Sequence, residues 1–562
     1  MKHIFLKTAL AALLMGGVAT SCVNDLNISS IDPQSSSSYG DMELLAKIYS
    51  TLGLTGQKGP AGSGDISSDE GESGFYRTTF NLQELCTDEC LWAWQTDADI
   101  PQITNIDWTA SSVRVQWTFQ RLAFDVTLCN FYLTNTEDKA EEADYKQYRA
   151  EVRFLRALHM WYFLDLWGKA PFKTTYDIYE LPVEKAGKEL YDWIDKELTE
   201  IEPDLAEVGA FNNSSNFGRA DKGAAYMLHA RLALNSAVYT KGAVKDYQKA
   251  IDYCDLLDGK YELSKAEKNG YTGYEQVFMA DNDQNPQAMK EIILPIRQDG
   301  AKTKCYSGAN YLVSSTRITG MPYMGTSNGW SCNFSRAALV KKFFSTLEDC
   351  PIATEKAPDG ATEAQIIACL LYTSDAAGTT TKDVQKKAND HRALFYSGCG
   401  GGLRKLQAEQ IAGFNSGLSI VKWSNIRTDG AATSHNEFPD VDIPLIRYAE
   451  MYLTRAEAKF RLTGDPQQAR ADIEVLRSRA GASTPATITE QYIIDEWCRE
   501  FYMEGRRRSD LIRFGLFTGD KYVWDFKGGV AEGKSVEDFF NVYPIPADDI
   551  NGNENLTQNP RY

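Results

Sequence analysis

The chain has 562 residues, of which 43% are hydrophobic and 24% are charged, and both values are ordinary for globular proteins. Its 77 acidic residues outnumber its 59 basic residues, so the formal net charge is -18. Proteins that bind nucleic acids use basic residues to displace counterions from phosphates, so this acidic balance argues against a nucleic-acid partner.

The N-terminal residues predict an export signal. Lys2 and Lys7 are followed by the apolar run TALAALLMGGVAT and by small residues before Cys22, which is the layout of a secretory signal peptide over residues 1–21. A membrane-spanning helix needs about 20 consecutive apolar residues, and this run is interrupted and too short. We therefore expect the segment to direct export rather than to anchor the chain as a helix.

Cys22 is the predicted site of lipid attachment. The residues Ala19-Thr20-Ser21-Cys22 resemble the lipobox of bacterial lipoproteins, in which the cysteine thiol is acylated, although Ala19 stands where Leu or Val is usual. Two or more acyl chains hold a protein at a membrane for long times. The Ser-rich residues 22–40 are then a flexible tether, because they hold too few apolar side chains to order themselves. The alternative is an ordinary secreted protein with a stray cysteine.

The segment from Tyr145 to Gly168 predicts a long amphipathic helix. Apolar side chains recur there at spacings of three and four residues, and Gly168 ends the pattern. His159 lies on the apolar stripe, where a hydrogen-bonded core histidine is more common than a ligand. We expect Trp161 and Trp167, in the same helix, to pack in the core. Three basic residues flank the stripe and are expected to form ion pairs: Arg149, Arg153 and Arg156.

Similar helices recur as pairs. Residues 219–260 predict two helices in succession, and residues 447–481 predict two more, separated by a Gly-Asp-Pro turn. Small and large apolar residues occupy matching offsets in both pairs, which lets antiparallel helices approach closely, as in tetratricopeptide-like repeats. We therefore expect a mainly α-helical fold, with its helix pairs mainly within residues 145–258 and 442–517.

Between about residues 260 and 440 the helical periodicity fades, and Gly, Asn, Ser and aromatic residues accumulate. Loops carry binding residues more often than the helices that support them. This region is too long for a simple connector and too aromatic for a disordered linker. We expect it to form a loop-rich face on the helical scaffold.

The cysteines predict neither a disulfide framework nor a metal site. Apart from Cys22 they are scattered from Cys86 to Cys498, and the close pair Cys86 and Cys90 has no second pair or histidine at zinc-site spacing. We expect most of them to be small buried hydrophobic residues, and we expect no cofactor.

The sequence contains no H-E-x-x-H motif, which argues against a zinc protease. The basic run from Arg506 to Arg508 is expected to lie in one helix with three acidic residues, where ion pairs at helical spacing are more common than a binding patch. Those acidic residues are Glu496, Glu500 and Glu504. A glycosidase stays open as an alternative, because its two carboxylates need only converge in space.

Six segments of the chain resemble one protein family. In chain order they are YRAEVRFLRALHMWYFLDLWGKAPF, GRADKGAAYMLHARLAL, IPLIRYAEMYLTRAEAKFRLTGD, LRSRAGA, EWCREFYMEGRRRSDLIRFG and VYPIPADDINGNENLTQNPRY. Together they resemble the SusD/RagB family of Bacteroidetes outer-membrane lipoproteins, in the expected order from the lipobox to Tyr562. The early segment LQELCTDECLWAWQ, Leu82 to Gln95, also resembles the T-D-E segment of this family.

The resemblance implies a mainly α-helical SusD-like domain over residues 41–562, with four tetratricopeptide-like helix pairs on one side and a loop-rich ligand-binding face on the other. It implies a surface-exposed, lipid-anchored protein of the outer membrane that captures oligosaccharides and delivers them to a SusC-like TonB-dependent transporter. The family binds without catalysis, so we expect no enzyme. A peptide-binding lipoprotein of the RagB type and a surface glycosidase are the alternatives.

The candidate ligand contacts are aromatic residues near the T-D-E segment and in the central loops. In the starch-binding relatives an arc of aromatic side chains supports the glycan. Sugars present C–H faces to rings and hydroxyl groups to polar neighbours, so such an arc is a suitable binding surface. Each ring could instead belong to the core. The comparable positions of this chain are Trp92, Trp94, Tyr306, Tyr311 and Trp330.

Overall fold

The fold is given by a computed structural model, in which the chain divides into two compact units, Met1–Ala46 and Lys47–Tyr562. The predicted signal peptide, Cys22 and all of the predicted tether before Gly40 lie outside the described residues. Helix α3 (Asp41–Ser50) begins the described part. The described residues are 40–56, 64–212, 215–318, 321–327, 329–344, 380–396, 398–399, 402–403, 406, 408, 410–414 and 416–562.

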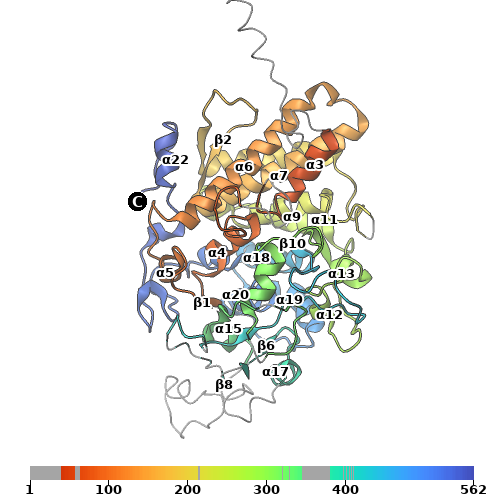
Figure 1. The fold of residues 1–562 in the computed structure, drawn as a ribbon, viewed down its shortest axis with the longest axis vertical. Helices are drawn as coiled ribbons and strands as arrows, with labels where there is room; N and C mark the ends of the chain where they lie inside the picture. The colour runs from red at the N-terminus through yellow and green to blue at the C-terminus, as the bar shows by residue number, and fades with distance from the viewer. Residues whose placement is uncertain are drawn as a thin grey trace, which may run out of the picture. The chain divides into compact units, whose positions relative to one another are not determined.

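Two long helices, α6 (Val113–Asn135) and α7 (Ala143–Trp167), pack side by side in the second unit (Figure 1). Gly168 ends α7 with a φ of 69°, a left-handed conformation that glycine adopts without strain. The predicted helix from Tyr145 to Gly168 is therefore confirmed. The other helices before residue 260 are α4 (Phe75–Glu84), α5 (Ile100–Asn105), α8 (Gly187–Ile201), α9 (Lys222–Leu234), α10 (Ser236–Tyr239) and α11 (Tyr247–Leu257).

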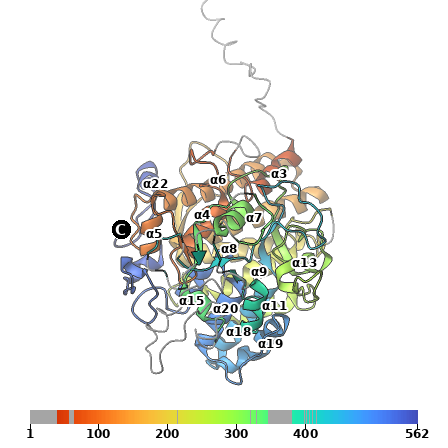
Figure 2. The same ribbon diagram turned by 60° about the horizontal axis from the view of Figure 1, so that its bottom comes forward.

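The two predicted helix pairs are present and contact each other. α9 packs against α11, and α11 also packs against α18 (Ala449–Thr463) of the later pair. Gly464 ends α18 with a φ of 73°, and α19 (Arg470–Arg479) follows after a short 3-10 turn. Figure 2 shows α11, α18 and α19 together. The remaining C-terminal helices are α20 (Glu490–Phe501), α21 (Arg507–Arg513) and α22 (Ala547–Gly552).

Short elements occupy the predicted loop-rich region. Its helices are α12 (Gly273–Gln276), α13 (Pro286–Glu291), α14 (Gly308–Thr316), α15 (Ala337–Lys341) and α17 (Thr381–Ala388). The described strands form two-stranded antiparallel sheets, and most of these sheets include a strand from this region. The pairs are β1 (Cys90–Trp92) with β5 (Asn333–Ser335), β2 (Lys169–Phe172) with β3 (Val183–Ala186), β4 (Ile292–Ile296) with β10 (Ile443–Arg447), β6 (Phe395–Tyr396) with β9 (Ser419–Ile420), and β7 (Gly398–Cys399) with β8 (Gly402–Leu403).

The side chains on α7 behave as their positions in the sequence predict. His159 is buried, its Nδ1 lies 2.6 Å from the Leu155 carbonyl oxygen, and its Nε2 lies 3.1 Å from a carboxylate oxygen of Asp125. Trp161 and Trp167 are buried. The three flanking arginines form ion pairs, Arg149 with Glu137, Arg153 with Glu197 and Glu200, and Arg156 with Glu197. No helix in the described part of the chain is both long and apolar enough to cross a membrane.

The T-D-E segment is buried against the C-terminal motif. The Asp88 Oδ1 atom accepts a hydrogen bond from Arg507 Nε at 2.7 Å, and its Oδ2 atom lies 3.1 Å from Lys342 Nζ. The Glu89 Oε2 atom accepts a hydrogen bond from the Met503 N–H at 3.1 Å. These partners are 419 and 414 positions apart in the chain, so the two segments meet only through the tertiary fold.

The arginines from Arg506 to Arg508 form contacts, but with other partners than the expected Glu496, Glu500 and Glu504. The prediction of one helix is wrong, because α20 ends at Phe501 and α21 begins at Arg507. Met503 lies between them in a left-handed conformation with a φ of 61°. The turn therefore separates the arginines from the helix that carries Glu496 and Glu500. Their partners are Asp510 for Arg506, Asp88 for Arg507 and the Asn541 carbonyl for Arg508.

Candidate functional site

Four of the five candidate aromatic residues lie together. The pairing of β1 with β5 places Trp92 opposite Asn333, near the loop that carries Trp330. The Trp92 ring stacks on Tyr311 of α14 at a centroid distance of 5.4 Å, and the Trp330 ring lies 6.3 Å from Tyr311. Tyr306 follows at 6.2 Å from Trp330. We call Trp92, Tyr306, Tyr311 and Trp330 the aromatic cluster.

Arg77 of α4 contacts all four residues of the aromatic cluster. Its guanidinium carbon lies 5.0 to 5.9 Å from three ring centroids, within the range of cation–π attraction. Those rings belong to Trp92, Tyr311 and Trp330. Its Nη1 atom donates a hydrogen bond to the Tyr306 carbonyl at 3.1 Å. Sequence reasoning missed Arg77, because a single arginine within a helical segment of mixed polar and apolar residues forms no motif.

Glu72 fixes the position of Arg77. The Arg77 Nη2 atom donates a hydrogen bond to Glu72 Oε1 at 2.6 Å, and Arg114 Nη2 at the start of α6 lies 2.7 Å from Glu72 Oε2. All three side chains are buried. One carboxylate therefore holds two guanidinium groups beside the aromatic cluster, and it prevents Arg77 from turning away from the rings.

The exposure of the candidate rings divides them into two groups. Trp92 is 3% exposed and Tyr311 is 0% exposed, so both act as packing residues under the surface. Tyr306 and Trp330 are half-buried, and Trp94, two residues beyond Trp92, is 44% exposed. Of the five candidates, these three have ring surface that a ligand can reach.

Polar groups accompany the accessible rings. The Tyr306 hydroxyl donates a hydrogen bond to Glu437 Oε1 at 3.2 Å. Burial and the neighbouring Glu437 carboxylate raise the pKa of Tyr306, so its hydroxyl stays protonated at neutral pH. The Trp92 indole N–H donates a hydrogen bond to Asp97 Oδ2 at 2.9 Å. The arrangement combines flat apolar faces with the partly exposed carboxylates of Glu437 and Asp97, and these groups suit the C–H faces and the hydroxyls of a sugar.

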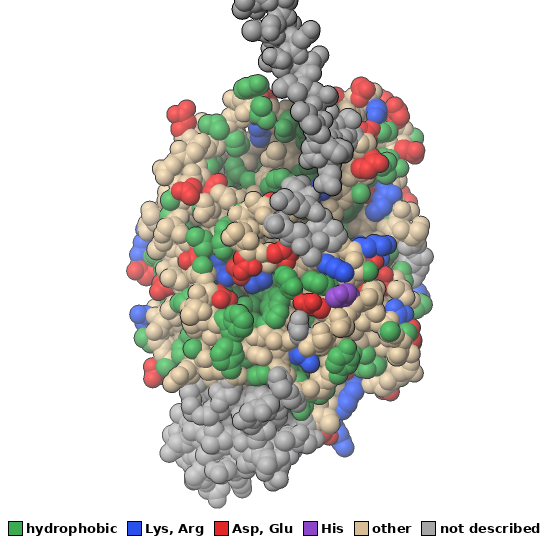
Figure 3. All heavy atoms as spheres, viewed as in Figure 1, with side chains coloured by type: hydrophobic (Ala, Val, Ile, Leu, Met, Phe, Trp, Pro, Cys, Tyr) green, Lys and Arg blue, Asp and Glu red, His purple; other side chains and the backbone are tan. Residues whose placement is uncertain are grey.

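The space-filling view shows a hollow at the centre of the face seen in Figure 1, where hydrophobic side chains gather between acidic and basic ones (Figure 3). Figure 1 places α4, which carries Arg77, in this region. A mixed apolar and charged depression of this kind is suited to a polar ligand that also presents apolar faces.

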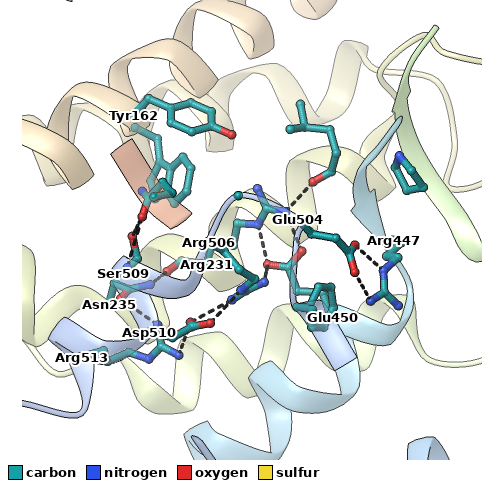
Figure 4. A pocket seen from close by; sticks show the side chains of 16 residues that line it. Tyr162, Arg231, Asn235, Arg447, Glu450, Glu504, Arg506, Ser509, Asp510 and Arg513 are labelled. Atoms are coloured by element: carbon teal, nitrogen blue, oxygen red, sulfur yellow. Dashed lines mark hydrogen bonds and ion pairs between the residues drawn. The ribbon is translucent and has the colours of Figure 1, made fainter. Parts of the chain in front are cut away.

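A separate cavity of about 40 Å³ near α9, α18 and α21 is lined by both charged and uncharged residues (Figure 4). Its arginines are all engaged by carboxylates, for example Arg231 with Glu450 and Arg447 with Glu504. Ligand pockets usually measure about 300 to 1,000 Å³, whereas this volume suits a few water molecules. The charged lining residues are Arg231, Arg447, Glu450, Glu504, Arg506, Asp510 and Arg513. The cavity is therefore too small for a ligand of ordinary size.

Two short sequence matches to catalytic motifs lack the strand-turn-helix context that the chemistry requires. Residues 325–329 fit G-x-S-x-G, but Ser327 lies in a loop, where its N–H donates a hydrogen bond to the Asn436 carbonyl at 2.6 Å. Residues 528–535 fit G-x-x-x-x-G-K-[ST], but no α-helix is present between residues 521 and 546, all of which the structure describes. Neither match therefore builds a nucleophile elbow or a phosphate-binding loop.

Comparisons with known proteins agree with this fold. Residues 290–562 match the SusD family. The chain is 55% identical over 569 residues to the starch-binding protein SusD of Bacteroides thetaiotaomicron, covering 100% of this chain and 99% of that protein.

Several solved structures resemble this fold at low identity. A SusD-like protein from Bacteroides fragilis is 19% identical with a TM-score of 0.63, over 95% of this chain and 100% of that chain. Surface glycan-binding protein A from Bacteroides thetaiotaomicron in complex with laminarihexaose is 18% identical with a TM-score of 0.61, over 92% of this chain and 98% of that chain. Both support the mainly α-helical SusD-like fold.

Proposed function

Because the chain belongs to the SusD family, we propose that it is a non-catalytic, cell-surface lipoprotein that binds glycans. The observation that carries this proposal is the aromatic cluster, in which Tyr306 and Trp330 keep accessible ring surface beside the buried Trp92 and Tyr311. The 55% identical relative is named a starch-binding protein, so α-linked glucose oligosaccharides are the first ligands to test.

The chemistry of the site supports a carbohydrate. The C–H faces of glucose rings pack on flat aromatic surfaces, and Tyr306, Trp330 and Trp94 supply such surfaces. Arg77 binds the Tyr306 carbonyl and contacts three of the rings, so the site is ordered before a ligand arrives. Less conformational entropy is then lost when a glycan binds.

We further propose that Cys22 carries the lipid anchor and that the bound oligosaccharide passes to a SusC-like TonB-dependent transporter in the outer membrane. The small residues before Cys22 and the polar tether after it support this arrangement. Cys22→Ala should release the protein from membranes. If this variant still fractionates with the outer membrane in cells that lack the transporter, the anchor is elsewhere.

Calorimetric titration of the purified protein with maltoheptaose and with laminarihexaose tests the ligand class. We expect binding of maltoheptaose, weaker or no binding of the β-linked glucan, and no release of reducing ends from either. Binding of peptides but of no glycan would favour a peptide-binding role, and an increase in reducing ends would make the protein a glycosidase.

A further inference from the structure

The loop between β2 and β3, together with the first residue of β3, exposes a concentration of apolar side chains. Within eight residues, five of them are 40% to 92% exposed, and Tyr179 at 92% and Ile178 at 72% are the extremes. Single exposed hydrophobic residues are normal on protein surfaces, but a contiguous group usually marks an interaction site. We call residues 176–183 the hairpin tip. Its exposed apolar residues are Tyr176, Ile178, Tyr179, Leu181 and Val183.

The hairpin tip is held in one conformation by hydrogen bonds. Lys173 Nζ donates to the carbonyl oxygens of Asp177 at 2.7 Å and of Glu180 at 2.6 Å, which closes the loop from inside. The Tyr179 N–H donates to Asp177 Oδ1 at 2.8 Å. Ile178 and Tyr179 therefore project from an ordered turn, and a partner would bind them without first having to order the loop.

Contacts with two other parts of the chain fix the base of the loop. On one side the Tyr176 ring packs edge to face on Phe131 of α6, with centroids 4.9 Å apart. On the other side Asn553 Nδ2 donates a hydrogen bond to the Pro182 carbonyl at 2.9 Å. The loop is thus clamped between α6 and the C-terminal segment, and Figure 1 shows β2, α6 and α22 in this region.

Helix α6 also separates the hairpin tip from the aromatic cluster. Arg114 near the start of α6 contacts Glu72 beside the cluster, and Phe131 near its end contacts Tyr176. These two helix positions are 17 residues apart, which corresponds to about 25 Å at about 1.5 Å per residue. A partner bound at the tip would therefore leave the rings of the ligand site accessible.

We propose that the hairpin tip docks into an apolar pocket with a basic rim on a second protein, with Ile178 and Tyr179 as the anchors. The exposed carboxylates of Asp177 and Glu180 flank these anchors and favour a basic rim. The partner is the transporter, so this inference rests on the proposed function. The tip forms one anchor of a larger contact, because five side chains supply less than the roughly 800 Å² per partner that stable interfaces bury.

The same observations argue against two other occupants. A symmetric tip-to-tip contact between two copies of this chain would bring the carboxylates of Asp177 and Glu180 together with their own equivalents, and like charges at an interface are unfavourable. An anionic membrane surface would repel the same two groups. Photo-crosslinking from the tip distinguishes the transporter from both of these occupants.

The first test is a double substitution, Ile178→Asp with Tyr179→Asp, in the full-length lipoprotein expressed with its transporter. We expect the amount of transporter that co-purifies to fall at least about tenfold, because anchor residues carry most of the binding energy of an interface. The matched control is Leu256→Asp with Leu462→Asp, two residues that are each 48% exposed on α11 and α18, and it should co-purify as the parent does. Thermal midpoint and maltoheptaose affinity should be unchanged in both variants.

The second test is a photo-crosslinking amino acid at position 179, irradiated in intact cells. The expected adduct contains the transporter, identified by mass spectrometry of the crosslinked peptides. An adduct with a second copy of this chain or with lipid would overturn the inference. If the double variant co-purifies with the transporter as the parent does, the inference about the hairpin tip is overturned and the proposed function still stands. If the transporter is absent from the parent preparation, both the proposed partner and the inference about the hairpin tip are refuted.

Discussion

Arg447 and Arg77 both lie over aromatic rings, but their surroundings differ. Arg447 of β10 is buried with its guanidinium 3.9 Å from the Phe501 ring centroid, and it donates hydrogen bonds to Glu500 at 2.7 Å and to Glu504 at 2.8 Å. Arg77 lies over the rings of the aromatic cluster and has one carboxylate partner, Glu72. The first arrangement is buried, with Arg447 only 1% exposed, whereas the second includes rings that solvent reaches.

The comparison shows that an arginine over an aromatic ring does not by itself indicate a ligand site. Around Arg447 the carboxylates satisfy the guanidinium and the rings fill the core, so the group stabilises the fold. Around Arg77 the same kind of contact holds Trp330, which is half-buried, in place. What distinguishes the two regions is the accessible ring surface, and the following variants test this distinction.

The largest effect should follow from Glu500→Ala. Burial alone would raise the pKa of Glu500, but three arginines lower it well below its usual range, so the carboxylate is ionised and central to the network. Removing it leaves these buried guanidinium groups short of a partner, which should lower the free energy of unfolding by about 3–5 kcal/mol in urea titrations. The three arginines are Arg392, Arg447 and Arg479.

The control is Asp192→Ala, which breaks an exposed ion pair with Lys188 on α8. Exposed pairs contribute about 0–1 kcal/mol, so this variant should unfold nearly as the parent does. Equal stabilities of the two variants would contradict a stabilising role for the buried network.

Trp92→Ala should lower the free energy of unfolding by about 3–5 kcal/mol, because it removes a buried ring that stacks on Tyr311. Trp94→Ala, only two positions away, should change it by no more than about 0.5 kcal/mol, because the ring is largely in solvent. Thermal melting of both variants measures the contrast. Similar losses of stability in the two variants would mean that the exposure of a ring does not distinguish packing residues from ligand contacts in this region.

Asp442, just before β10, should make stability depend on pH. Burial raises the pKa of Asp442 to about 8, even though its Oδ2 lies 3.1 Å from Nε of the half-exposed Arg297. The folded state binds this proton more tightly than the unfolded chain, whose Asp titrates near pH 3.9. Its stabilising contribution is therefore complete below about pH 4 and is lost as the pH rises to about 8.

The variant Asp442→Asn is uncharged at every pH and should remove this part of the pH dependence. Between pH 5 and pH 8 we expect the free energy of unfolding of the parent to fall by about 3–4 kcal/mol relative to the variant, since one pKa unit corresponds to about 1.4 kcal/mol. Urea titrations at several pH values measure this difference. Parallel pH profiles for parent and variant would show that Asp442 is ionised throughout the range.

The smallest effects, measured on binding, should come from the accessible rings. Trp94→Ala and Trp330→Ala should each weaken maltoheptaose binding about two- to tenfold, because an aromatic contact contributes about 0.5–1.5 kcal/mol beyond the area it buries. Tyr179→Ala, which removes an exposed ring outside the aromatic cluster, is the control and should bind as the parent does. Full affinity in both tryptophan variants would move the ligand site away from this face.

The sequence by itself was sufficient for the features that depend on local chemistry. The periodicity from Tyr145 and the stop at Gly168 predict α7, because a helix needs only apolar spacing and a residue that tolerates positive φ. The Gly-Asp-Pro turn after α18 was predictable for the same reason. The family motifs also predicted the SusD-like fold, which the comparisons confirm.

Only the tertiary structure decided which groups are buried and which partners they meet. Trp92 and Trp94 are alike in sequence, but Trp92 is covered by Tyr311, which comes from a helix more than 200 positions away. Arg77 has no local signature, because its three rings converge from β1, α14 and a loop. Arg507 pairs with Asp88 across 419 positions, and no helical spacing encodes that contact. Burial and long-range pairing are properties of the packed chain, so they could not be inferred from the order of residues along a single segment.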